Sequence, residues 1–303
     1  IGGAISNVGY GRTPFSSVVE IFLKATNSGA FDSVESADAY MEQRKLVNDN
    51  QYVLPNSNYV SNVHTKELYS HQAIFFDGSK NTDGYVLYIH GGAYVNQMSS
   101  FHVGFCDKLA KKINYTVIAP IYPLAPNHTY EETYDLIEKI YTDLLLENKP
   151  ITIMGDSAGG GFSAAFCEYL TEKGYNQPDK LVLLSPWVDV SMSGETYNDY
   201  YDPMLGPVGL KEMGEKWRGT TDIQNYKISP LFGDATGLPK TLMFVGTREI
   251  FYPDVNKFNE KLLAANVDVT LIIGQGMNHV FPVYPTFEAR LALNQIASFI
   301  LDK

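Results

Sequence analysis

The fold of this chain is decided by Ile151-Thr152-Ile153-Met154-Gly155-Asp156-Ser157-Ala158-Gly159. The first four residues read as a short buried strand, and Phe162–Phe166 downstream reads as part of a helix. A Gly-x-Ser-x-Gly in this context predicts a sharp strand-to-helix turn that lifts the serine hydroxyl out of the sheet as a nucleophile. Glycine is needed on both sides because the two backbones approach closely and the serine itself is strained. Ser157 is therefore the predicted nucleophile.

Strand-like and helix-like segments alternate after about residue 55. The expected strands are a pair within Val63–Phe76, then Tyr85–Ile89, Tyr115–Ala119, Ile151–Met154, Leu181–Leu184, Thr241–Val245 and Val267–Ile273. The expected helices are Phe101–Ile113, Tyr130–Leu146, Val255–Ala264 and Thr286–Leu301. This rhythm predicts the α/β class, with a mostly parallel, twisted sheet flanked by helices on both faces.

Two regions break this rhythm. Residues 1 to about 50 contain amphipathic helical segments at Phe15–Ala25 and Ala37–Leu46, before any strand. Residues 190–228 are rich in Tyr, Gly, Met and Trp and fit no βα unit. Insertions of this kind usually lie over the carboxyl edge of the sheet, where ligands bind. We therefore expect a single domain over residues 1–303, with a helical cap contributed by about 1–50 and 190–228.

The composition is that of a globular protein: 303 residues, 45% hydrophobic and 19% charged. A net charge of −11 without a basic block argues against a nucleic-acid partner, because a phosphate backbone would be repelled. Cys106 and Cys167 lie in apolar helix-like runs and are expected to be buried free thiols. No stretch reaches the length of a membrane span and no signal-peptide pattern opens the chain, so we expect a cytoplasmic protein. Because the sequence begins without Met, an earlier leader stays open.

A serine nucleophile requires a base that accepts its proton. His279 is the one histidine after Ser157, and it lies in the Gly-rich stretch Gly274–Phe281 just past the last expected strand. The other five histidines precede the serine: His64, His71, His90, His102 and His128. A lone histidine is more often a core or surface residue, but this position favours the base.

The acid that orients the base is expected after the penultimate strand. Glu249 lies four residues past the expected end of that strand, and we assign the role to it. Asp254 is the rival, although its place beside a helix start is more typical of an N-cap. Asp202, inside the expected cap, is a weaker candidate.

The oxyanion formed by attack on a carbonyl needs fixed N–H donors. The expected strand Tyr85–Ile89 runs into the Gly-rich loop His90-Gly91-Gly92-Ala93-Tyr94. A plain turn is the simpler interpretation of this loop, but its place after a central strand and upstream of Ser157 favours a donor role. Its amides, with that of Ala158, predict a three-donor oxyanion hole.

Several motifs together resemble the hormone-sensitive-lipase-like family of α/β-hydrolase carboxylesterases. The resemblance covers about Val86 to His279. It is carried by His90-Gly91-Gly92-Ala93, Tyr122-Pro123-Leu124-Ala125-Pro126, Gly155-Asp156-Ser157-Ala158-Gly159-Gly160, Ser185-Pro186-Trp187, Ser229-Pro230-Leu231-Phe232-Gly233 and the Gly246–Glu249 and His279 loops. Together these motifs are highly specific, whereas any one of them alone is weak. The fold implied by the resemblance is the α/β-hydrolase fold.

The resemblance also implies roles for individual residues. It places the oxyanion donors on Gly92, Ala93 and Ala158, the nucleophile on Ser157 and the base on His279. His90, with Gly91, would support the loop, and Asp156 would be structural. This chain departs from the family pattern at three positions, with Ala93 for the third glycine, Glu249 where Asp is commoner, and Pro123 for the usual Arg.

The expected function is a serine carboxylesterase that hydrolyses small to medium acyl esters through an acyl-enzyme, with no cofactor and no metal. A peptidase or amidase with the same triad is the enzymatic alternative, and aryl esters compared with aminoacyl amides would separate the two. A non-catalytic small-molecule receptor is the other alternative, but such proteins typically lose a triad member. A homodimer stays open. The acyl pocket would draw on aromatic side chains of Tyr94, Phe101, Phe31, Tyr201 and Trp217.

Overall fold

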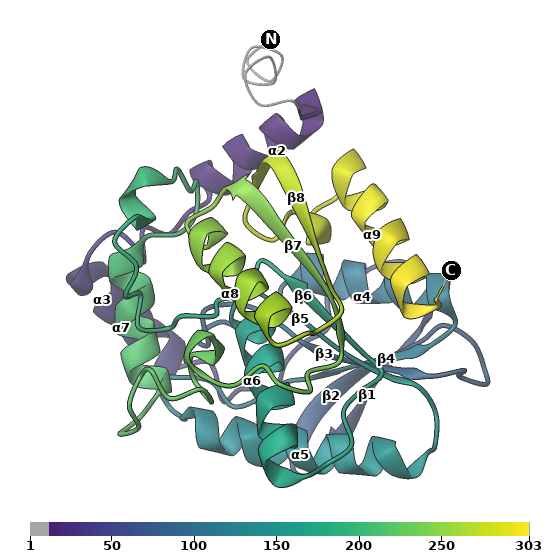
Figure 1. Cartoon of the computed structure of the whole chain (residues 1–303). Helices are drawn as coiled ribbons and strands as arrows, with labels where there is room; N and C mark the ends of the chain where they lie inside the picture. The colour runs from purple at the N-terminus through teal and green to yellow at the C-terminus, as the bar shows by residue number, and fades with distance from the viewer. Residues whose placement is uncertain (1–11, 303) are drawn as a thin grey trace.

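A computed structural model describes residues 12–302, and its centre is one twisted β-sheet (Figure 1). The described residues give this sheet eight strands in the order β1-β2-β4-β3-β5-β6-β7-β8. Their bounds are β1 Asn62–Leu68, β2 His71–Asp77, β3 Tyr85–Ile89, β4 Thr116–Pro120, β5 Ile151–Asp156, β6 Lys180–Leu184, β7 Lys240–Arg248 and β8 Val269–Asn278. β2 pairs antiparallel with β1 and β4, and every other pair of neighbours is parallel. The expected α/β architecture is confirmed.

The helices cover both faces of the sheet. The α-helices within residues 12–302 are α2 Pro14–Ala25, α3 Val34–Lys45, α4 Ser100–Ile113, α5 Tyr130–Leu146, α6 Ser157–Lys173, α7 Pro207–Trp217, α8 Tyr252–Ala264 and α9 Phe287–Ile300. Short 3₁₀ turns lie at η1 Tyr197–Asp199, η2 Pro230–Phe232 and η3 Phe281–Val283. α4 and α9 cover one face, and α5, α6 and α8 cover the other (Figure 1).

Alternation along the strands explains this two-sided cover. In β3, Leu87 and Ile89 belong to the core beneath α5, α6 and α8, while Val86 and Tyr88 belong to the core beneath α4 and α9. Successive side chains of a strand point to opposite faces, so a strand that is apolar at every position needs a helix layer on each side.

Most expected elements are confirmed, but the last two strands and one helix have different bounds. β7 continues to Arg248, so Glu249 follows the strand directly instead of lying four residues beyond its end. β8 continues to Asn278, so His279 also follows its strand directly. α8 begins at Tyr252, which places Asp254 inside the first turn, and the N-cap position belongs to Phe251. The expectation that Asp254 caps this helix is wrong.

Three helices outside the βα units gather near the carboxyl edge of the sheet (Figure 1). α3 packs along α7, and Asn27, just after α2, donates to the carbonyl of Met204 at 3.1 Å. These segments belong to the two regions expected to form the cap; residues 1–11 of that expectation lie outside the described residues.

α2 is amphipathic in an unexpected sense. Its buried face carries Ser16, Ser17 and Glu20, and Phe15 and Phe22 on the outer side are more than half exposed. The buried polar groups are paired: Glu20 binds Arg12 and Arg248, and Ser16 donates to Glu288 at 2.6 Å. Polar contacts to β7 and α9 therefore hold the helix, together with the buried side chain of Leu23.

Two expectations about chemistry can be compared with the fold. Cys106 and Cys167 are both buried free thiols, as predicted. Within residues 12–302, every helix is too short or too polar to cross a lipid bilayer.

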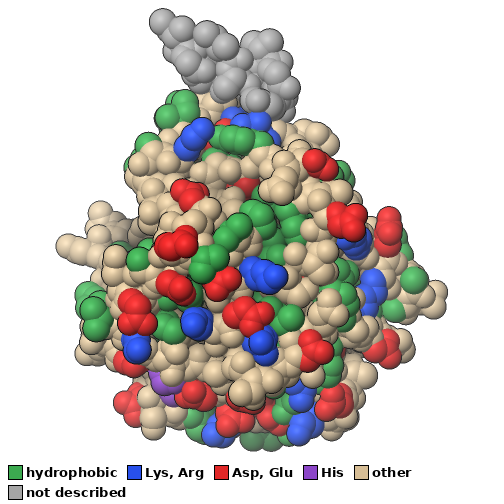
Figure 2. Space-filling model, turned by 90° about the vertical axis from the view of Figure 1, so that its left-hand side faces the viewer, with side chains coloured by type: hydrophobic (Ala, Val, Ile, Leu, Met, Phe, Trp, Pro, Cys, Tyr) green, Lys and Arg blue, Asp and Glu red, His purple; other side chains and the backbone are tan. Residues whose placement is uncertain are grey.

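The face that carries α3 and α7 shows Asp and Glu side chains spread among Lys and Arg, without a basic cluster (Figure 2).

Candidate active site

Ser157 occupies a strained turn between β5 and α6. Its φ is +51°, a left-handed conformation that a residue with a side chain rarely adopts. A Cβ added at Gly159 would lie 2.0 Å from the carbonyl oxygen of Ile89, and one at Gly155 would lie 2.3 Å from the carbonyl oxygen of Gly159. Both glycines are thus required by close backbone contacts, for the reason that the motif predicted.

Three side chains predicted from distant segments meet at this turn. His279 Nε2 lies 2.9 Å from Ser157 Oγ, and His279 Nδ1 lies 2.7 Å from Glu249 Oε2. All three residues are buried. A carboxylate only accepts, so Nδ1 carries the proton that points to Glu249, and Nε2 is left to accept from the serine hydroxyl.

Two fixed loops hold this geometry. The second carboxylate oxygen of Glu249 accepts from the N–H of Gly246 at 3.0 Å. The N–H of Val280, a residue in the left-handed region with φ +49°, donates to Ser185 Oγ at 3.0 Å. The imidazole between them therefore has both its partner and its backbone fixed.

The pKa of His279 is raised although the imidazole is buried. Burial lowers the pKa of this imidazole, but the hydrogen bond and charge of Glu249 outweigh that effect, aided by the charges of Asp202 and Asp156. The net pKa lies above its ordinary value of 6.5. A base of this kind is neutral above that pKa and stabilised as the imidazolium once it has taken a proton.

The two rival acids make other contacts. The carboxylate of Asp254 binds the hydroxyl of Tyr197 and, at 3.1 Å, the ammonium of Lys257. Asp202 accepts from backbone amides, including that of Ile250 at 3.2 Å. Within residues 12–302, neither carboxylate is hydrogen-bonded to His279, whereas Glu249 is.

The loop after β3 is anchored by Asp156, the residue before the serine. This buried carboxylate accepts from the N–H of Gly91 at 2.9 Å and from the hydroxyl of Tyr88 at 2.6 Å, and it pairs with His102 at 3.0 Å. Burial raises the pKa of Asp156, but these partners lower it more, so the net pKa lies below its usual value. The resemblance implied a structural role for this residue, and its contacts are of that kind.

His90 supports the same loop. Its Nδ1 lies 2.7 Å from the carbonyl oxygen of Gly91, and its ring stacks on Tyr122 at 4.4 Å between centroids. Burial lowers the pKa of His90 to about 4, so the ring is neutral at physiological pH.

The loop backbone beyond His90 is shaped for donation. Gly92 has φ +124° and Ala93 has φ +54°. Within the described part of the chain, the N–H groups of Gly92 and Ala93 form no hydrogen bond with another protein atom. Ala158 lies in the first turn of α6, where helical N–H groups have no partner inside the helix. The methyl group of Ala93 is accommodated in the left-handed region, a conformation that glycine would adopt more easily.

A cavity of about 250 Å³ joins these groups, lined by Gly92, Ala93, Ser157 and His279. Its wall is largely apolar and includes Phe31, Phe101, Met204, Leu205, Val280, Val283 and Tyr284. Among the aromatic liners expected from the sequence, Phe31 and Phe101 are therefore correct. Tyr94 and Trp217 lie deeper, with their rings stacked at 4.2 Å, and Tyr201 lies at the surface under the Arg248 guanidinium.

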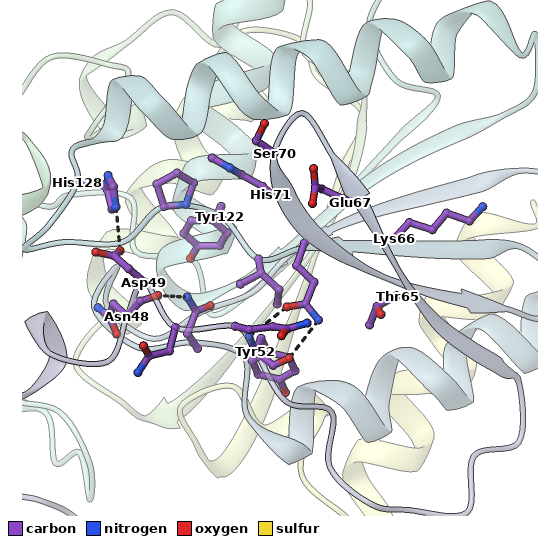
Figure 3. A pocket seen from close by; sticks show the side chains of 16 residues that line it. Asn48, Asp49, Tyr52, Thr65, Lys66, Glu67, Ser70, His71, Tyr122 and His128 are labelled. Atoms are coloured by element: carbon purple, nitrogen blue, oxygen red, sulfur yellow. Dashed lines mark hydrogen bonds and ion pairs between the residues drawn. The ribbon is translucent and has the colours of Figure 1, made fainter.

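A larger groove of about 700 Å³ lies beside the β1–β2 hairpin (Figure 3). Many of its lining side chains are polar, and some of them bind one another, such as Asp49 with His128 at 2.9 Å. Of the predicted site residues it contains none, and Gln97 is the residue that lines both this groove and the catalytic cavity. The candidate triad and the loop of Gly92 and Ala93 line the smaller cavity, so size alone does not identify the candidate site.

Sequence reasoning missed His102 and Ser185 as contributors to the site, and it weighed Asp202 only as a weaker candidate for the acid. His102 binds Asp156, Ser185 fixes the loop of His279, and Asp202 contacts the segment after Glu249. A usable signal existed for two of them. Ser99 and His102 have the i, i+3 spacing of a capping box, which would have put His102 at the start of α4, and Ser185 follows β6 at the same sheet edge.

Comparisons with known proteins show similarity to α/β hydrolases and esterases. Residues 86–283 match the profile of a family described as alpha/beta hydrolase fold. An esterase from Acinetobacter venetianus is 36% identical over 223 residues, covering 71% of this chain and 73% of that protein. An acetyl-hydrolase from Streptomyces hygroscopicus is 30% identical over 224 residues, covering 71% and 74%. The crystal structure of a hormone-sensitive lipase from a metagenome library superposes with a TM-score of 0.79 at 29% identity, over 95% of this chain and 97% of that one.

Proposed function

This chain belongs to the α/β-hydrolase family, among its hormone-sensitive-lipase-like esterases, and is a carboxylic-ester hydrolase; from that premise we propose that it works through a Ser157–His279–Glu249 triad and an acyl-enzyme. The observation that carries the proposal is the unbroken chain of contacts from Glu249 through His279 to Ser157, at 2.7 and 2.9 Å.

In the acylation step, His279 Nε2 takes the proton of the Ser157 hydroxyl as Oγ attacks the ester carbonyl carbon. Glu249 holds the ring tautomer and stabilises the imidazolium that forms. The imidazolium then gives its proton to the leaving alcohol, and the acyl group stays on Oγ. The raised pKa of His279 fits this sequence, because the ring must hold a proton between the two transfers.

In the deacylation step, water takes the place of the alcohol. His279 removes a proton from the water as it attacks the acyl carbon, and the proton returns to Ser157 Oγ when the acid leaves. The balance is one ester and one water to one acid and one alcohol, and the chain's own side chains carry every proton.

The negative charge on the carbonyl oxygen would be held by the amides of Gly92, Ala93 and Ala158. Among the described residues, the N–H groups of Gly92 and Ala93 donate to no other protein atom, and the N–H of Ala158 lies in the first turn of α6. Each such donor contributes about 3–4 kcal/mol of transition-state stabilisation in comparable hydrolases.

We further propose that α2, α3 and the segment from 190 to 228 act as the cap over this site. Phe31, between α2 and α3, and Leu205, before α7, both line the catalytic cavity. A cavity of about 250 Å³ with an apolar wall favours small to medium acyl groups as substrates.

Replacement of Ser157 by Ala tests the proposal. Turnover of 4-nitrophenyl acetate should fall to background in Ser157→Ala, with the protein still folded. Ser70→Ala is the matched control, because Ser70 also stands beside a histidine, in the groove of Figure 3, and its loss should leave turnover unchanged. Unaltered turnover by Ser157→Ala would rule out the assigned nucleophile.

A further inference from the structure

Asp202 is a partly buried residue on the segment between η1 and α7, and its carboxylate accepts hydrogen bonds from two separate segments. Its Oδ1 accepts from the backbone N–H groups of Met204 at 2.8 Å and Leu205 at 2.9 Å. Its Oδ2 accepts from the N–H of Ile250 at 3.2 Å. One side chain thus joins residues that are more than forty positions apart in the sequence.

Each end of this link lies against the catalytic cavity. Met204 and Leu205 are part of the cavity wall. Ile250 directly follows Glu249, whose carboxylate binds His279. Removing the carboxylate of Asp202 would therefore release the wall and the acid loop from one another, and would leave three backbone N–H groups without this acceptor.

Asp202 also acts on His279 through charge. Burial raises the pKa of Asp202 to about 6, against the opposing effect of the imidazolium and of the amides it binds, so the carboxylate is ionised at neutral pH. Its charge in turn helps to raise the pKa of His279. Other ionisable groups that act on this pair or lie beside it are Glu249 after β7, Asp156 at the end of β5 and Tyr284 after η3. The cations Lys24 and Arg248 lie over the ring of Tyr201, the residue before Asp202.

We propose that Asp202 is a positioning residue for the ester-hydrolysing site: its carboxylate ties the cavity wall at Met204 and Leu205 to the loop of Glu249, the residue that binds His279. This inference rests on the triad proposed above. It adds a second carboxylate to that triad, one that acts through the backbone and through space without touching the base.

The test compares two variants. Asp202→Asn removes the charge; its one oxygen can still accept from Met204 and Leu205, but its NH2 group cannot accept from Ile250. Because the charge is lost, the acid limb of the kcat/KM profile should move to lower pH, by roughly half a unit or more. Asp202→Glu keeps the charge and lengthens the arm, so the acid limb should stay near the wild-type pH. Its ratio of KM values for 4-nitrophenyl acetate and hexanoate should change instead, because the cavity wall is repositioned. Asp199→Asn, an exposed neighbour in η1, should match the wild type in both measurements.

The outcomes distinguish this inference from the proposed function. Melting curves and stoichiometric phosphonylation of Ser157 establish that each variant is folded with an intact nucleophile. An Asp202→Asn enzyme that is labelled at Ser157 and has the wild-type acid limb would overturn the charge role, and an unchanged KM ratio in Asp202→Glu would overturn the wall role. Loss of Ser157 labelling in the wild type would instead contradict the triad itself.

Discussion

His90 and His279 are both buried histidines that follow strands of the same sheet, yet the pKa of one is lowered and the pKa of the other is raised. Burial lowers the pKa of His90 to about 4, and the hydrogen bond of its Nδ1 to the carbonyl of Gly91 and the charge of Asp156 do not offset that effect. The same burial acts on His279, but the carboxylate of Glu249 at 2.7 Å raises its pKa above 6.5. Burial therefore does not decide whether a histidine can act as a base; the partner does.

Among changes to the partners of the two rings, the largest effect is expected from Glu249→Gln, which removes the carboxylate that distinguishes His279 from His90. The rate should fall by about 10⁴-fold, because an amide no longer favours the tautomer with Nε2 free. Since burial alone lowers the pKa of His279, the acid limb of the remaining activity should move below its wild-type position. A pH profile of kcat/KM measures both changes, and Asp254→Asn provides the comparison. A larger loss at 254 would overturn the assignment of the acid.

A smaller but still severe loss is expected from Gly92→Ala, in the loop that His90 supports. A Cβ at this position would lie 2.6 Å from the carbonyl oxygen of Asn96, and the φ of +124° is strained for any side chain. Displacement of one oxyanion donor should lower kcat by roughly 10²–10³-fold. Gly104→Ala in α4, where a Cβ meets nothing within 4 Å, is the matched control. Equal kinetics for the two variants would exclude an oxyanion role for this loop.

Replacing His90 or His279 by Asn tests the different roles of the two rings. Asn at 90 can still donate to the carbonyl of Gly91, so we expect a loss of about tenfold or less. The acid limb should not move, because His90 is already neutral throughout the working range. Asn at 279 should abolish turnover. Rate measurements from pH 5 to 9 distinguish the two cases, and a displaced acid limb in His90→Asn would contradict the neutral, supporting role given to that ring.

The smallest effect is expected from Ala93→Gly. Glycine relieves the left-handed strain at φ +54°, worth about 1–2 kcal/mol, but loses about 0.5–1 kcal/mol of backbone entropy. The two terms nearly cancel, so the melting temperature should shift by only a few degrees and kcat/KM by roughly threefold at most. A loss as large as that of Gly92→Ala would mean that the methyl group of Ala93 contacts the substrate.

Much of this site was predictable because it depends on local pattern and chain order. Ser157 is marked by glycines that the backbone contacts require, and His279 is unique after it. Glu249 was chosen as the candidate acid in spite of a wrong strand end, and it contacts His279 because β7 runs directly into it. Asp254 shows the limit of local reasoning. Its position near a helix start predicts an N-cap, but its carboxylate instead accepts from the hydroxyl of Tyr197, a residue far from it in sequence.

The contacts that sequence reasoning did not predict join segments far apart in sequence. Asp202 binds the N–H of Ile250 and His102 binds Asp156, and no periodicity announces either pair. The polar inner face of α2 is unpredictable for the same reason, because its partners Arg248 and Glu288 lie more than two hundred residues away. Hydrophobic pattern predicts layers well, but it does not predict which polar groups meet inside them.

The central claim is that His279, held by Glu249, activates the hydroxyl of Ser157. Labelling with an organophosphonate, followed over pH and located by mass spectrometry, tests it most directly. We predict one label per chain, on Ser157, at a rate that rises through a pKa above 6.5 and is lost in His279→Ala. A label on another residue, or an undiminished rate in His279→Ala, would contradict the account.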